Sequence, residues 1–427
     1  MQADVIVIGA GAAGLYAARQ IANSGKLVTV LEARNRVGGR IHTIDDALFE
    51  KPLEGGAEFV HGQLPITLRL LHEAALQTVA AGGTIWRNKG GRLKKEEDFI
   101  ADEEALMKAL NSVQKDMSIA EFLATYFSHP KYEDLRQSLT AYVEGYYAGD
   151  ATKASTLALK EEWEASEEED QRIIGGYGQL MQYLYKQCME KGCRFYFDTP
   201  VNTIHWQKGN VVVTAADGTT YGGAKVLLTV PVGVLQSSRL PSSILFNPAI
   251  DDKLALFQKL GFGGVIKIAL QFSEPFWQKD FGLNNMGFLF SEEAIPTWWT
   301  QHPQQRALLT GWCAGPAAEK LKHLHDEALF EEALTSLARI FKLEKDAVKQ
   351  KITAWKVANW PADPFTHGGY SYTTIDGNNA IESILQPLDN TIYFAGEGLY
   401  TGAEIGTVEA AFSSANGVTS KMLSQFQ

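Results

Sequence analysis

Asp4-Val5-Ile6-Val7-Ile8-Gly9-Ala10-Gly11-Ala12-Ala13-Gly14 is the stretch that decides the fold. Its apolar run ends in glycine and predicts a buried β-strand, and the apolar spacing of residues 15–21 predicts a helix directly after it. The turn between them has the pattern G-x-G-x-x-G. Gly9 permits the tight turn, Gly11 lets backbone amides approach a pyrophosphate, and Gly14 lets the helix pack closely against the strand. The stretch therefore predicts a dinucleotide-binding unit.

The residues that follow complete this unit. Residues 27–31 predict a second strand, and Glu32 stands at its end. A carboxylate at this place accepts hydrogen bonds from a ribose 2′-hydroxyl, which favours the unphosphorylated ribose of FAD or NAD over that of NADP. The N-terminus of the helix offers free N–H groups and the positive end of its dipole to the phosphates. Strand, turn, helix and acid agree with one another, although this unit alone does not separate FAD from NAD.

Length and composition set the class of protein. A chain of 427 residues is too long for one core, so we expect two domains. The content of 45% hydrophobic and 21% charged residues is that of a soluble globular protein. The net charge of −11 argues against a nucleic-acid partner and mildly favours cationic small molecules through the field of the whole protein.

Cysteine usage and apolar runs indicate the compartment. Cys188, Cys193 and Cys313 show neither metal-binding spacing nor a disulfide framework, which suits a reducing environment. No secretion signal is visible, and no apolar run reaches the roughly 20 residues that span a bilayer. We therefore expect a cytoplasmic protein with no membrane anchor and no metal site.

The rest of the chain alternates between helical and extended patterns. Residues 76–174 have a mostly helical pattern, and residues 201–230 are expected to form short strands with a hairpin at Asp217-Gly218. The acidic run at residues 161–162 and 167–170 is interpreted as a solvated loop or helix face. The strands expected to build one antiparallel sheet, around a helical region, are residues 264–272, 286–290, 307–312 and 351–357.

Several further motifs share the pattern of one family. Residues 33–40, Ala-Arg-Asn-Arg-Val-Gly-Gly-Arg, form a second glycine turn flanked by arginines. Residues 55–62, Gly-Gly-Ala-Glu-Phe-Val-His-Gly, are rich in glycine, and Gly396-Glu397 follows a strand and precedes a helix that starts near Thr407. In this order the motifs resemble the flavin-containing amine oxidases, which include the monoamine and polyamine oxidases. The resemblance extends over nearly the whole chain.

The resemblance implies an α/β protein with a Rossmann-type FAD-binding domain and a second, α+β substrate domain built on an antiparallel sheet. It places the FAD-binding domain at residues 1–75, 175–240 and 386–427, and the substrate domain at residues 76–174 and 241–385. The positions that it assigns to the cofactor are Gly9, Gly11, Ala12, Gly14, Glu32, Ala33, Arg34, Gly38, Gly39, Arg40, Gly56, Ala57, Glu58, Phe59, Val201, Trp360, Gly396, Glu397, Thr407 and Val408. Ser371 stands where the covalent monoamine oxidases carry a cysteine, so FAD is expected to bind noncovalently.

Lys267 is the candidate for a catalytic role. It lies inside the apolar run of residues 265–272, and burying an ammonium group is costly unless it has a partner. The resembled family has a lysine in this pattern, bonded through a water molecule to flavin N5. The alternative is an edge strand from which Lys267 faces solvent, because the alternation of side chains does not decide its face.

Four residues are candidates for the substrate side. His61 lies where polyamine oxidases carry a histidine or an acid that faces the substrate. Trp360, Tyr370 and Tyr372 belong to a run similar to a family segment near the flavin, and aromatic walls suit amines by shape and by quadrupole attraction. Packing in the core is the competing interpretation for each aromatic residue. Glu144 is a weaker candidate for holding a distal ammonium group.

The resemblance predicts oxidative deamination of an amine, by hydride transfer from the carbon next to nitrogen to flavin N5, with O₂ reduced to H₂O₂. The expected partners are an amine and O₂, and a homodimer is considered. L-Amino-acid oxidases and flavin desaturases are alternatives of the same fold. An amino-acid oxidase needs an arginine for the carboxylate, and Arg69, the candidate near the early motif, lies within an apolar helical run. A flavoprotein without turnover, acting as an interaction module, is the alternative from another class.

Overall fold

The computed structural model describes residues 2–62, 64–96, 100–165, 170–237 and 243–426. Its first sheet begins with the predicted strand β1 (Ala3–Ile8), whose residues are almost all buried and which pairs in parallel with strands on both sides. The strand order is β10-β2-β1-β13-β12-β11-β14, and β22 also pairs with β13. The other members are β2 (Val28–Leu31), β10 (Arg194–Tyr196), β11 (Val201–Gln207), β12 (Asn210–Ala215), β13 (Thr220–Leu228), β14 (Leu245–Asn247) and β22 (Ile392–Phe394).

Helices cover the first sheet. The helix predicted after the glycine turn is α1 (Ala12–Asn23), and it packs against α7 (Gly178–Glu190) and α15 (Val408–Ser424). A Cβ atom at Gly14 would lie 1.9 Å from the carbonyl oxygen of Gly9, so only glycine permits this approach of helix to turn. The helix α2 (Pro65–Glu73) joins the same layer, because the buried carboxylate of Glu409 accepts hydrogen bonds from its first backbone N–H groups.

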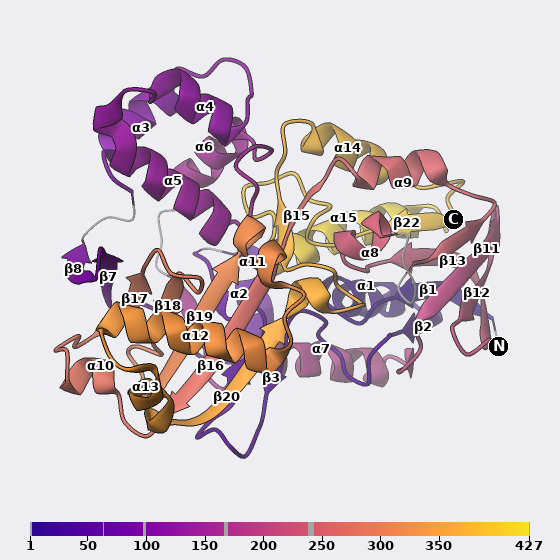
Figure 1. Cartoon of the computed structure of the whole chain (residues 1–427). Coiled ribbons are helices and arrows are strands. Elements are labelled where there is room, and N and C mark those ends of the chain that lie inside the picture. The colour runs from indigo at the N-terminus through magenta and orange to yellow at the C-terminus, as the bar shows by residue number, and fades with distance from the viewer. Residues whose placement is uncertain (1, 63, 97–99, 166–169, 238–242, 427) are drawn as a thin grey trace.

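A second sheet lies beside the first in Figure 1. Its strand order is β20-β16-β19-β18-β17-β7-β8, and its pairs are antiparallel except for β17 with β7. The expected antiparallel sheet is thereby confirmed for all four predicted strands, with one parallel pair added. The members are β7 (Thr84–Lys89), β8 (Arg92–Glu96), β16 (Val265–Phe272), β17 (Met286–Phe290), β18 (Thr297–Trp299), β19 (Leu308–Ala314) and β20 (Ile352–Asn359).

Helices also pack on the second sheet, and its core contains the buried Trp277 and Trp298. The predicted helical region around residues 316–341 forms α11 and α12. The helices in this part of the chain are α10 (Phe276–Lys279), α11 (Gly315–Leu321), α12 (Asp326–Phe341), α13 (Lys345–Lys351) and the 3₁₀ turn η2 (Trp360–Ala362).

The region predicted to be mostly helical begins instead with strands. Residues 78–80 form β6, and residues 84–96 form the hairpin β7–β8. Gly90 and Gly91 make its turn with φ angles of 56° and 73°, which only glycine adopts readily. The predicted helices do follow, as a lobe at the top of Figure 1. They are α3 (Glu103–Leu110), α4 (Ile119–Tyr126), η1 (Pro130–Tyr132), α5 (Glu133–Gly145) and α6 (Thr156–Ala165).

Three elements inside the segment assigned to the second domain belong to the core of the first sheet instead. The strand β14 pairs with β11, and residues of α9 (Asp251–Phe257) and α14 (Gly377–Ile384) lie in the same hydrophobic cluster as β1 and β13. The chain thus leaves the first core later than residue 240 and returns to it before residue 386. Apolar pattern alone does not say which of two adjacent cores a short element joins.

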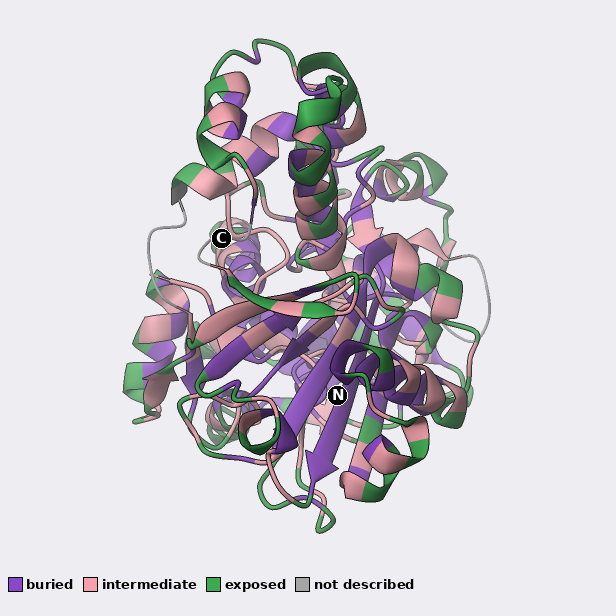
Figure 2. Ribbon diagram, turned by 60° about the vertical axis from the view of Figure 1, so that its left-hand side comes forward, coloured by how far each residue is buried: buried purple, intermediate pink, exposed green. Residues whose placement is uncertain are grey.

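Short strands form a separate three-stranded sheet. The strand β5 (Phe59–Val60) pairs with β9 (Gln171–Ile173), which also pairs with β6 (Thr78–Ala80). The strands β1, β2 and β22 of the first sheet are buried almost throughout, whereas β10 and β14 carry exposed residues. Figure 2 shows many exposed residues on the outer helices and loops. In the described part of the chain, no helix has the length and apolarity needed to cross a membrane. The remaining elements are β3 (Thr43–Ile44), β4 (Leu53–Glu54), β15 (Gly261–Gly263), β21 (Tyr370–Tyr372) and α8 (Val232–Gln236).

Candidate active site

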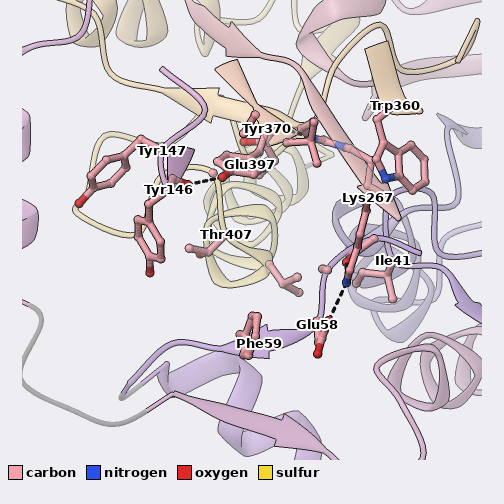
Figure 3. A pocket seen from close by; sticks show the side chains of 18 of the residues that line it. Ile41, Glu58, Phe59, Tyr146, Tyr147, Lys267, Trp360, Tyr370, Glu397 and Thr407 are labelled. Carbon is pink, nitrogen blue, oxygen red and sulfur yellow. Dashed lines mark hydrogen bonds and ion pairs between the residues drawn. The ribbon is translucent and has the colours of Figure 1, made fainter. Parts of the chain in front are cut away.

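A cavity of about 1260 Å³ runs between the two sheets and the helical lobe. At one end it is lined by the glycine turn after β1, by Glu32 and by the second glycine turn. At the other end it is lined by Tyr146, which directly follows α5, and by residues of α6, among them Glu162. Figure 3 shows Lys267, Glu58 and Trp360 on one side of this space and Tyr146 and Tyr147 on the other.

The nucleotide motif is ordered at the first end. Glu32 is buried, and its two carboxylate oxygens accept hydrogen bonds from the backbone N–H of Ala10 at 2.7 Å and of Arg34 at 2.9 Å. Burial raises the pKa of Glu32, while these backbone donors and Arg34 act in the opposite direction. Its carboxylate is therefore fixed at the end of β2, where the sequence places the ribose-binding acid.

Paired arginines hold the second glycine turn. Arg34 contacts Asp363 at 2.6 Å, and Arg36 donates to the carbonyl oxygens of residues 37, 39 and 41. Arg40 contacts Glu397 at 2.6 Å and donates to the carbonyl oxygen of Gly369 at 2.8 Å. The acid of the C-terminal motif is thereby tied to the N-terminal motif, so segments from both ends of the chain form one wall.

Lys267 lies in a buried charge cluster. Its Nζ is 2.6 Å from Oε2 of Glu58 and 3.1 Å from the carbonyl oxygen of Gly56. Glu58 also accepts from Arg172 Nε at 2.8 Å and from Trp299 Nε1. Burial by itself raises the pKa of Glu58, but Lys267 and Arg172 outweigh burial and lower that pKa to about 2.

The alternative of a solvent-facing Lys267 is wrong. Its strand β16 is central, between β19 and β20, and all eight of its residues are buried. The ammonium group lines the cavity and has the partner that burial requires. Its role toward flavin N5 stays a prediction.

The first end of the cavity fits a flavin dinucleotide. The glycine turn leaves room where side chains would fill it, and the N-terminus of α1 faces the space with free N–H groups. The N-terminus of α15 adds a second positive dipole end, since Thr407, Val408 and Ala411 line the wall. Every assigned cofactor position except Gly14 lines the cavity, and Gly14 acts through packing.

Two of the predicted aromatic residues line the cavity, and one does not. Trp360 is buried and donates from Nε1 to the carbonyl oxygen of Gly55 at 2.9 Å. Tyr370 lines the wall and donates to the backbone carbonyl of Tyr146, as Figure 3 shows. The prediction for Tyr372 is wrong. Tyr372 follows Tyr370 by two residues on β21, which is about 7 Å along the strand. Its side chain therefore lies beyond the cavity, in the core of the helical lobe.

His61 faces the cavity as part of a small network. Its Nδ1 lies 2.8 Å from Oδ1 of Asp170 and 3.3 Å from the hydroxyl oxygen of Tyr146. Asp170 belongs to the run that the sequence analysis interprets as solvated, and this interpretation is wrong for Asp170 because it pairs with His61 and lines the cavity. The imidazole is thus oriented by a carboxylate.

The interpretation of the acidic run as a solvated segment is also wrong for Glu162. Glu161 is exposed, as expected, but Glu162 turns inward and lines the cavity. The sequence contains the signal, because Glu162 follows the buried Leu159 by three residues and so shares its helix face. Residues 167–169 lie outside the described part of the chain.

The helical lobe also supplies aromatic residues that the sequence analysis did not select. Tyr142, Tyr146, Tyr147 and Trp163 line the second end of the cavity. Glu144 and Glu404 line it too. Tyr142, in the last turn of α5, and Tyr146, the residue that caps this helix, stack at 5.2 Å because they are four residues apart, a spacing visible in the sequence.

The arginine of an amino-acid oxidase has no counterpart in the described wall. Arg69 lies outside the wall on α2, with over half of its side chain exposed, and contacts Glu73 and the hydroxyl of Tyr16. The wall contains Arg34, Arg40 and Arg87, and each already forms an ion pair with a carboxylate, at 2.6 Å in every case. A substrate carboxylate would have to compete with these partners.

Residues 12–422 match the family described as flavin containing amine oxidoreductase. The chain belongs to this family. The cofactor expected from the motifs, FAD, is therefore confirmed. All three cysteines are buried outside the cavity wall, in agreement with noncovalent binding.

Comparison with individual proteins extends this result. Lysine-specific histone demethylase 2 of Homo sapiens is 29% identical over 430 residues, which cover 92% of this chain and 50% of that protein. The chain thus spans about half the length of the first curated relatives. Polyamine oxidase 4 of Oryza sativa subsp. japonica is 28% identical, with 96% of this chain and 86% of the oxidase covered. Wild-type putrescine oxidase bound to putrescine shares the fold, with a TM-score of 0.80, 20% identity and full coverage of both chains.

Proposed function

We propose that this chain is an oxidase of primary or secondary amines that lack an α-carboxylate, either monoamines or polyamines. The reaction is the two-electron oxidation of the C–N bond to an imine, which water hydrolyses, with O₂ reduced to H₂O₂. FAD, when bound, accepts the hydride from the carbon next to nitrogen and passes the electrons to O₂. The protein binds and orients the amine and keeps its nitrogen deprotonated for the reaction.

The charge of the cavity wall carries this proposal. Every arginine of the described wall is already paired with a carboxylate, while carboxylates and tyrosines line the second end. Such a wall favours a cation and leaves a substrate carboxylate without a partner, which costs several kcal/mol. The similarity to a polyamine oxidase supports the same substrate class.

His61 is the candidate for removing the proton from the substrate's ammonium group. Asp170 fixes its ring at Nδ1, which leaves Nε2 as the other nitrogen. An amine must lose its proton before hydride transfer, so rates are expected to rise with pH toward the pKa of the bound amine. Lys267 and Trp360 line the same cavity.

A peroxide-coupled assay tests the proposal. Spermine, tyramine, L-phenylalanine and L-leucine are compared under identical aerobic conditions, and the amines are expected to give the higher kcat/KM. Amino acids that react with a kcat/KM well above both amines would make the chain an amino-acid oxidase. If no amine bleaches the flavin under anaerobic conditions, the chain is a flavoprotein without this turnover.

A further inference from the structure

The second end of the cavity combines aromatic rings with carboxyl groups. Tyr142 stacks on Tyr146 with ring centroids 5.2 Å apart and lies equally far from Trp163, and Tyr147 meets Tyr146 edge to face at 5.3 Å. We call these four side chains the aromatic cluster. Tyr146 exposes 45% of its surface although it lies in the cavity wall, so its free surface is available to a ligand.

Carboxyl groups surround this cluster on several elements. Glu162 comes from α6, Glu144 from α5, and Glu404 from the loop before α15. Among the described residues that line this end, Arg87 supplies the positive charge, and Glu96 already pairs with it at 2.6 Å. The wall therefore has more negative than positive groups where it meets the aromatic cluster.

We propose that Glu162, with Glu404 beside it, binds a second ammonium group of the substrate, so that the substrates are diamines or polyamines. The inference rests on the proposed function and names the substrate class of the same site. The reacting nitrogen lies toward Lys267, and the distal ammonium lies among Glu162, Glu404 and the aromatic cluster. Figure 3 shows that Tyr146 and Tyr147 stand across the pocket from Lys267, as this arrangement requires.

The chemistry of the distal group follows from the wall. An ammonium group donates three hydrogen bonds, which carboxylates accept, and the face of a tyrosine ring attracts a cation. A simple monoamine of the same length brings only methyl groups to this place and leaves Glu162 without a cation. A carboxylate at the distal end meets like charge. The wall therefore discriminates by charge as well as by length.

Glu58 and Glu162, two carboxyl groups of the cavity wall, differ in how their charge is partnered. Glu58 has Lys267 and Arg172 as partners, and its pKa falls to about 2. Burial raises the pKa of Glu162 to about 8, the hydroxyl of Tyr147 opposes this shift, and Glu404 adds to it. The other groups that interact with Glu162 are Tyr142, Tyr146 and Tyr370, which are neutral. Among the described residues, no cation is found acting on Glu162, and a bound ammonium would supply one.

The test uses the FAD-loaded enzyme and the substitution Glu162→Gln, which keeps shape and removes charge. The control is Glu164→Gln, an exposed acid on the same helix outside the wall. Each protein is assayed with 1,4-diaminobutane and spermidine against butylamine. The wild type is expected to have a kcat/KM for the diamine that is about tenfold or more above that for butylamine. In Glu162→Gln, the kcat/KM for the diamine should fall by about 10- to 100-fold, whereas the value for butylamine should change less than twofold.

A binding measurement without turnover accompanies the kinetics. The dithionite-reduced holoenzyme is titrated anaerobically with 1,4-diaminobutane in a calorimeter, and Glu162→Gln is expected to bind it about tenfold more weakly than the control. If Glu162→Gln does not retain FAD, the ratio of diamine to monoamine kcat/KM is measured for Glu404→Gln instead. In that variant, kcat/KM should fall for the diamine and not for the monoamine. Equal losses on diamine and monoamine, or no diamine preference in the wild type, overturn this inference and leave the amine oxidase function standing. A wild type that oxidises no amine overturns both.

Discussion

At the scale of single residues, the cavity depends on how buried charges are partnered. Lys267 and Glu58 neutralise each other at 2.6 Å, and Arg172 gives Glu58 a second cation. Glu162 has no such cation among the residues that the structure describes, and its pKa is raised. The first arrangement belongs to a permanent part of the wall, whereas the second leaves a place for a charged ligand.

Lys267→Met is expected to retain FAD but to slow flavin reduction, reoxidation or both by about tenfold or more in stopped-flow traces. The substitution also removes one partner of a buried carboxylate, so the free energy of unfolding should fall by about 3 kcal/mol. The double variant Lys267→Met with Glu58→Gln separates these effects. It should recover part of the stability without recovering the flavin kinetics. Unchanged half-reactions in the single variant would remove Lys267 from the reaction.

The ratio of diamine to monoamine kcat/KM is expected to rise as pH increases from about 7 through 8 in the wild type. Glu162 is an acid with a pKa raised to about 8, so it ionises in this window and then attracts the distal ammonium. Glu162→Gln should show a flat ratio. The pH dependence of stability has the opposite sign. A carboxyl group with a raised pKa stabilises the folded free enzyme at low pH, and this contribution is lost as the pH rises through about 8. Thermal melts of Glu162→Gln at pH 6 and 9 should therefore show a relative gain at pH 9.

At the scale of elements, helix termini and glycine turns bring distant segments to one cavity. The N-termini of α1 and α15 both face it, and these two helices pack on each other although they come from opposite ends of the chain. Arg40 and Glu397 connect the loops beside them. The contact of α1 with the turn after β1 depends on the absence of a side chain at Gly14.

Gly14→Ala is expected to lower the free energy of unfolding by about 3 kcal/mol and to reduce FAD occupancy, because its Cβ would lie 1.9 Å from a backbone oxygen that cannot move freely. Gly417→Ala is the matched control. It lies exposed within α15 with no atom within 4 Å of its Cβ position, so the change should stabilise the protein by about 0.5 to 1 kcal/mol. Denaturant unfolding and the flavin absorbance of the purified variants measure both effects. A Gly14→Ala protein with full FAD content would contradict the packing argument.

At the scale of the whole molecule, two sheets and a helical lobe enclose one long cavity. The first sheet provides the nucleotide end, the second provides Lys267, and the lobe provides the aromatic cluster and Glu162. The cysteines lie in the cores rather than in the wall, since Cys188 and Cys193 pack beside α1 and Cys313 lies in the core of the second sheet.

Acid precipitation of the purified yellow protein is expected to release intact FAD into the supernatant. The physical reason is that the described wall contains no thiol, and Ser371 stands where a cysteine would form the covalent bond. Absorbance and chromatography of the supernatant and the pellet measure the partition. Flavin that stays with the pellet would show a covalent link through another residue.

The sequence alone determined the nucleotide unit, the family and most of the elements. Its signals there are local, because a strand, a glycine turn and a helix follow one another within a few residues. The strands of the second sheet were also predictable, since their apolar runs have the length of buried strands. The hairpin at Gly90-Gly91 was missed although its turn residues are visible.

Only the tertiary structure decided which side chains share the cavity. The face of Lys267 could not be read from β16, because a strand buried on both faces shows no alternation. The acidic run around Glu162 and Asp170 has the composition of a solvated segment, yet two of its members turn inward against α5 and β5. Tyr370 and Tyr372 share one short strand but lie on either side of the cavity's edge. Composition and spacing are properties of the chain, whereas the wall of a cavity is set by long-range packing that brings residues hundreds of positions apart into contact.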